Sequence, residues 1–119
     1  MSVKSTLKEA ASTVGTAGSS VIDAARNIIK SGAGGVEDIV KAAFEIAREI
    51  GVSAENLVKD VIIGAVEATK DLIGSGEDAV NEVVTKAEKA AGDMTEEGGE
   101  AVRRGIAKAK DVLKEPFKK

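Results

Sequence analysis

Side chains that commonly carry catalysis are scarce in this chain of 119 residues, which has no His, Cys, Trp or Tyr. It therefore lacks an imidazole base, a thiolate nucleophile and a zinc site of the usual kind, and it cannot form a disulfide. Nucleophilic catalysis by Ser would need a Lys as the base, and no Ser–Lys spacing stands out. We expect a protein that is not an enzyme and that uses no cofactor.

Carboxylates are the remaining candidates for chemistry, because paired acids can hold a hard cation or move a proton. They cluster at Glu37/Asp38, Glu45/Glu49, Glu77/Asp78 and Glu96/Glu97/Glu100. None of these acids falls on an apolar face of the expected helices. Most lie in first turns, where a negative charge offsets the helix dipole. We expect solvated helix faces and no metal site.

One glycine motif, Gly74-Ser75-Gly76-Glu77-Asp78-Ala79, matches a form of the dinucleotide-binding fingerprint. That fingerprint works only after a strand, with a helix N-terminus facing the pyrophosphate. Here the preceding segment has a helical pattern, and two acids would lie beside the phosphates. The motif is therefore expected to be a turn between two helices.

The elements that would position these residues follow from the spacing of apolar side chains, which recur every three or four residues from 36 to 114. A strand would alternate with period two, and the best strand candidate, residues 61–66, has charged flanks that fit a helix better. The residues expected to pack helix on helix are Val36, Val40, Ile50, Val58, Val61, Leu72, Val80, Val84, Val102 and Ile106.

Glycines and capping residues divide this region into helices at about 36–50, 53–73, 76–91 and 94–114. Gly51 before Ser53, Gly74 before Ser75, and Gly92 before Asp93 each pair a C-terminal glycine with an N-cap. Pro116 is expected to close the last helix. Because short connections force neighbouring helices to run antiparallel, the fold class predicted is all-α, an up-and-down bundle of four helices.

The N-terminal segment, residues 1–31, has one apolar seam in unbroken helical phase: Val3, Leu7, Ala10, Val14, Ala17, Val21, Ala24 and Ile28. The seam passes through Gly15 and Gly18, and each glycine costs a helix interior about 1 kcal/mol. We expect one long, kinked helix, with a pair of shorter helices as the alternative. A Gly-rich linker at 32–35 then leads to the bundle at 36–115, and 116–119 form a tail.

The stretch Gly64-Ala65-Val66-Glu67-Ala68-Thr69-Lys70-Asp71-Leu72-Ile73-Gly74 resembles phrases in small, uncharacterised bacterial proteins rich in Ala, Gly and Val. The resemblance covers mainly residues 36–74, and it implies helices but no chemistry. In composition the chain is also similar to late-embryogenesis-abundant proteins and phasins, although it lacks the strict 11-residue repeat of the former.

The C-terminal region has the only local charge bias in a chain whose net charge is −3. Its basic residues could contact an anionic surface from one side of an amphipathic helix, and they include Arg103, Arg104, Lys108, Lys110 and Lys114. We do not expect nucleic acid as a partner, because the chain is acidic overall and has no aromatic platform on which bases could stack.

These patterns together predict a cytoplasmic, non-catalytic helical protein with a structural or interaction role. It would act by self-association or by binding another helical protein through its apolar seams. The alternative is an amphipathic-helix protein that binds a lipid surface, through peripheral membrane contact, or an apolar ligand.

Overall fold

The computed structural model describes the backbone of residues 3–12 and 17–117 and the side chains of residues 3–12 and 20–113. Within these ranges the chain forms six helices. They are α1 (Val3–Ala11), α2 (Ala17–Ser31), α3 (Val36–Ile50), α4 (Ala54–Ile73), α5 (Gly76–Asp93) and α6 (Glu96–Phe117). No strand occurs in these described ranges, and the candidate strand at 61–66 lies within α4. The all-α prediction is confirmed.

The turns on either side of α4 form as the glycines and serines predict. Gly51 and Gly74 both adopt φ of 76°, the left-handed conformation that ends a helix at little cost for glycine. Ser53 then caps α4, its Oγ accepting a hydrogen bond from the Asn56 N–H at 3.3 Å. Ser75 caps α5 in the same way, accepting from the Asp78 N–H at 3.3 Å.

The turn before α6 differs from the sequence prediction. Gly92 and Asp93 belong to α5, and the residue that caps α6 is Thr95, whose Oγ1 accepts from the Gly98 N–H at 3.2 Å. Asp93 is therefore not the N-cap, because Thr95 offers the same kind of side-chain oxygen two residues later. Pro116 is expected from the sequence to close α6, but it lies within the last turn, and the helix ends one residue later at Phe117.

The N-terminal segment forms two helices, so the single long helix is wrong and the alternative of a helix pair is observed. Helices α1 and α2 pack against each other, which two halves of one straight helix could not do. Residues 13–16, including the Val14 and Gly15 positions of the predicted seam, lie outside the described residues.

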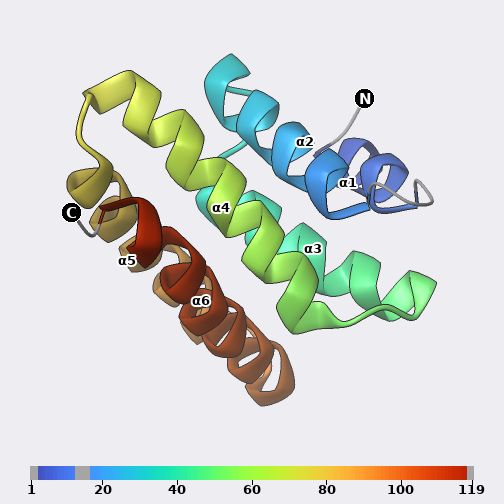
Figure 1. Cartoon of the computed structure of the whole chain (residues 1–119). Coiled ribbons are helices and arrows are strands. Elements are labelled where there is room, and N and C mark those ends of the chain that lie inside the picture. The colour runs from blue at the N-terminus through green and yellow to red at the C-terminus, as the bar shows by residue number, and fades with distance from the viewer. Residues whose placement is uncertain (1–2, 13–16, 118–119) are drawn as a thin grey trace.

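The helices form three hairpins, α1–α2, α3–α4 and α5–α6, placed side by side in two layers (Figure 1). Helices α2, α4 and α6 lie next to one another in one layer, and α3 contacts both α1 and α5 in the other. Within each hairpin the two helices also pack across the layers. Each of the helices α3, α4 and α5 packs on the helix that follows it, whereas α2 makes few contacts with α3.

Helix α4 is the centre of this arrangement, because it contacts α2, α3, α5 and α6. Its neighbours approach closely at glycines. A Cβ on Gly64 would lie 2.4 Å from the Ile22 carbonyl oxygen of α2, and one on Gly105 of α6 would lie 2.5 Å from a Val58 methyl. No larger residue fits at either contact without a shift of the neighbouring helix.

Candidate interaction surfaces

The predicted helix-packing seam supplies much of the protein's own core. The seam residues that are buried are Val36, Val40, Val58, Val61, Val102 and Ile106. Ile50, Val80 and Val84 are partly buried and pack against that core. In this fold, therefore, most of the seam is not accessible to a partner.

Leu72 is the exception, since 66% of it is exposed and its place on the buried seam has to be corrected. The cause is a difference in helix length. Helix α4 has 20 residues and α3 has 15, and the two are paired from the turn that joins them. The last turn of α4 therefore extends beyond the start of α3, which leaves Leu72 and Ile73 uncovered.

Four large apolar side chains are exposed among the described residues. They are Val52 in the α3–α4 turn, Leu72 and Ile73 at the end of α4, and Val112 on α6. Single exposed apolar residues are normal on a protein surface. Leu72 and Ile73 are adjacent in the sequence, and 66% and 50% of these residues are exposed. The end of α4 therefore exposes two neighbouring apolar side chains, which the sequence did not predict.

The basic residues of α6 divide into paired and unpaired groups. Arg104 forms an ion pair with Glu100 at 2.6 Å, and Lys108 binds Glu55 of α4 at 3.0 Å. Arg103 and Lys110 are exposed, and no acidic partner within the described residues holds either of them. The side chain of Lys114, the fifth predicted contact, lies outside the described part.

The apolar side of α6 is not free to meet a lipid surface. Val102, Ile106, Ala109 and Leu113 are all buried. They pack in the core that α6 shares with α4 and α5. Contact between this apolar side and a membrane would require α6 to leave the core, whereas its exposed basic residues could act only through charge.

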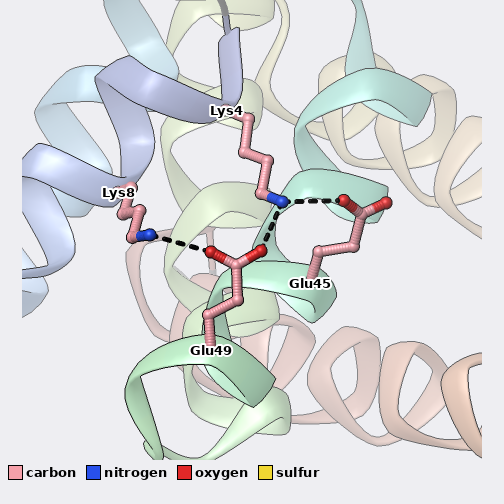
Figure 2. Close-up of polar contacts among 4 residues, drawn as sticks. All are labelled: Lys4, Lys8, Glu45 and Glu49. Atoms are coloured by element: carbon pink, nitrogen blue, oxygen red, sulfur yellow. Dashed lines mark hydrogen bonds and ion pairs between the residues drawn. The ribbon is translucent and has the colours of Figure 1, made fainter.

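A cluster of four charged residues joins α1 to α3 (Figure 2). The Lys4 ammonium lies 3.2 Å from a Glu45 carboxylate oxygen and also donates to Glu49. Lys8 donates to the other Glu49 oxygen at 2.8 Å. Sequence reasoning did not connect these residues, although each pair has i,i+4 spacing and so faces one side of its helix.

The cluster changes the ionisation of two members. Hydrogen bonds from Lys4 and then Lys8 lower the pKa of Glu49 from 4.5 to about 2. Hydrogen bonds to Glu49 and Glu45 raise the pKa of Lys4 above its ordinary 10.5. Both shifts show that the charged forms are favoured when α1 is docked on α3.

The other carboxylates do not build a reactive centre. Glu55, Glu97 and Glu100 line an open hollow beside the starts of α4 and α6, together with Arg104. Each of these acids has a basic side chain within ion-pairing distance: Glu55 has Lys108, Glu97 has Arg48 and Glu100 has Arg104. In the part of the chain that the structure describes, no group of three or more acids could hold a metal ion.

One further carboxyl, Asp60 of α4, is largely covered. Burial raises its pKa, and the charge of neighbouring Lys59 opposes that rise. Asp60 borders a shallow hollow with Ala11, Val21 and Leu57, and this hollow has no second acid that could share a proton or a cation.

Comparisons with known proteins leave these surfaces as the main guide to function. No family model matches the chain, and no match was found among the curated proteins or the solved structures. As for membranes, none of the described helices combines the length and the apolar character that crossing a bilayer requires. The glycine motif at 74–79 forms the α4–α5 turn between two helices, so its context is not that of a dinucleotide site.

Proposed function

We propose that this chain is a non-catalytic helical protein with a structural or interaction role, acting by association with itself or with another helical protein. The observation that carries the proposal is the layout of the hairpins. Each end hairpin, α1–α2 or α5–α6, packs on the central hairpin from one side only. Stacked helical hairpins are stabilised by their neighbours, and the other side of each end hairpin is open to a further helix pair.

The surface details agree with this role. The end of α4 exposes Leu72 and Ile73, and the far helix α6 exposes Arg103 and Lys110 without acidic partners among the described residues. Exposed apolar anchors and unpaired charges are two kinds of feature through which protein partners are bound and selected. A lipid surface is the less favoured partner, because the apolar side of α6 is buried.

Light scattering and sedimentation equilibrium, from micromolar to millimolar protein, test the proposal. We expect a molar mass that rises with concentration above the 12.2 kDa of one chain. A Leu72→Ser/Ile73→Ser variant measures how much of that rise depends on the end of α4. A strict monomer throughout, with no helical partner bound by the purified protein, would remove the proposal.

Anionic vesicles separate the lipid alternative from protein association. We expect no flotation with vesicles and no change of circular dichroism on their addition. Flotation that disappears in an Arg103→Glu/Lys110→Glu variant would instead favour the lipid surface.

A further inference from the structure

Helix α1 is held by contacts that a second copy of the chain could supply equally well. Its largest contacts are with α2 and α3, and Val3 also lies against Gly34 in the turn between those helices. Leu7 is fully buried, and Val3, Ala10 and Ala11 are partly buried. Its charged contacts are with Glu45 and Glu49 of α3. Because a second copy has the same α2 and α3, these contacts can form whether α1 comes from the same chain or from the other copy.

We propose that α1 is an exchangeable helix, which in a dimer docks between α2 and α3 of the second copy and receives that copy's α1 in return. This inference rests on the proposed function of association and names its site and its partner. Exchange of an identical element between protomers is a low-cost route to a dimer, because each docking contact of the monomer is formed again.

The sequence between the two helices supports this exchange. Val3, Leu7, Val21 and Ile28 belong to one helical phase that continues through the connecting residues. A hairpin has no need for that continuity, since its two helices are independent in phase. A single helix over residues 3–31 does need a continuous phase, because its apolar residues must all lie on one face. The continuous seam is then explained if the same segment forms one helix in the exchanged dimer.

Straightening that segment would carry α1 out of its own groove. A helix of this length spans about 43 Å, at a rise of about 1.5 Å per residue. Lys4 and Lys8 would then be far from their own Glu49, and Leu7 would leave its buried site. The α1 of one chain is thereby presented to the vacant groove of another.

Two features decide between the arrangements. Gly15 and Gly18 disfavour a continuous helix and so favour the closed monomer. Release of α1 exposes Leu7, which is fully buried in the closed chain, so a released α1 is stabilised by docking again. The result is a closed monomer at low concentration and exchange as the concentration rises.

Two charge-reversed chains test the exchange directly. The first carries Lys4→Glu/Lys8→Glu, and the second carries Glu45→Lys/Glu49→Lys. In either chain alone α1 and its groove have like charges, whereas in a mixed dimer both grooves receive an α1 of opposite charge. After the two chains are refolded together at high concentration, we expect native mass spectrometry to show mainly the mixed dimer.

A matched control uses an ion pair that does not involve α1. Lys30 of α2 and Asp71 of α4 are 2.7 Å apart within one chain. A chain with Lys30→Glu and a chain with Asp71→Lys should show no preference for each other when mixed. A mixed dimer formed equally well by this control pair would overturn the exchange, because charge reversal alone would then explain it.

A change at the connection gives a second, independent test. Gly15→Ala/Gly18→Ala favours the continuous helix, and we expect the dimer dissociation constant to fall about tenfold or more. Thr16→Pro breaks a continuous helix and should abolish the dimer. If the charge-reversed chains stay apart and the double alanine variant remains monomeric at the same concentrations, the exchange is excluded.

The outcomes also separate this inference from the wider proposal. If the wild-type chain dimerises but the charge-reversed chains do not prefer each other, association stands and exchange of α1 fails. If every chain is monomeric at all concentrations and no helical partner is bound, both ideas fail together.

Discussion

Helices α1 and α4 are fixed to the fold by different kinds of interaction. Helix α4 has ten buried residues and contacts four other helices. Helix α1 has one buried residue, Leu7, and is held on its outer side by exposed ion pairs. Because apolar burial is the dominant favourable term in folding and exposed ion pairs contribute little, α4 should set the stability of the whole fold. Helix α1 should instead open by itself.

The largest effect that tests this comparison is expected from Ile62→Ala in α4. Ile62 is fully buried, and removing its side chain leaves a cavity that should cost about 2–5 kcal/mol of unfolding free energy. Urea unfolding followed by circular dichroism measures the loss. Ile73→Ala is the matched control, since it makes the same change on the same helix at a residue that is half exposed. Equal losses for the two variants would contradict the central role of α4.

Gly64→Ala should give the next largest effect. Alanine usually favours a helix, but here its Cβ would meet the Ile22 carbonyl and the Ala25 methyl of α2. We expect a net loss of about 1–3 kcal/mol from overpacking. Gly92→Ala is the control, because it is also in a helix but a Cβ there would meet nothing within 4 Å. It should stabilise the chain by about 0.4–1 kcal/mol. Thermal unfolding compares the two, and a stabilised Gly64→Ala variant would show that α2 and α4 can separate without cost.

Leu7→Ala should act locally rather than globally. The substitution removes the only fully buried side chain of α1, so we expect the amides of residues 3–11 to lose most of their protection from hydrogen exchange. The midpoint of global unfolding should move less than in the Ile62→Ala variant. Leu72→Ala makes the same change at a leucine that is 66% exposed, and it should alter neither measurement. Cooperative loss of the whole fold on Leu7→Ala would refute the separate opening of α1.

What the sequence could predict about these regions was mostly local. The bounds of α3 follow from its apolar spacing, and the αL glycines Gly51 and Gly74 with the caps Ser53 and Ser75 follow from residue type. These features depend on neighbours within a few residues, so a pattern is enough to find them.

The features that were missed depend on distant parts of the chain. Leu72 is exposed because α3 is shorter than α4, and its own helical phase does not contain that information. The cluster of Lys4, Lys8 and Glu49 joins residues 41 or more positions apart. The seam through residues 3–28 fitted one helix as well as two, and only the packing of α1 on α2 decided between them.

The smallest expected effect concerns the charge cluster that holds α1. The pKa of Glu49 is lower in the docked state than its ordinary 4.5, so its stabilisation is complete above that pH and is lost as the pH falls toward about 2. The pKa of Lys4 is raised, so its contribution is present below 10.5 and is lost as the pH rises beyond that value. Protection of the α1 amides, corrected for intrinsic exchange, should therefore decline in both ranges while that of α4 does not.

Glu49→Gln distinguishes this cluster from general acid unfolding. The amide keeps the shape and one acceptor oxygen but carries no charge, so we expect α1 to open several-fold more often at neutral pH and to depend less on acid. High salt should weaken α1 in the wild type more than in the variant, because screening acts on exposed charges. Equal pH and salt responses in the two proteins would mean that apolar contacts alone hold α1, and apolar burial would then account for both helices.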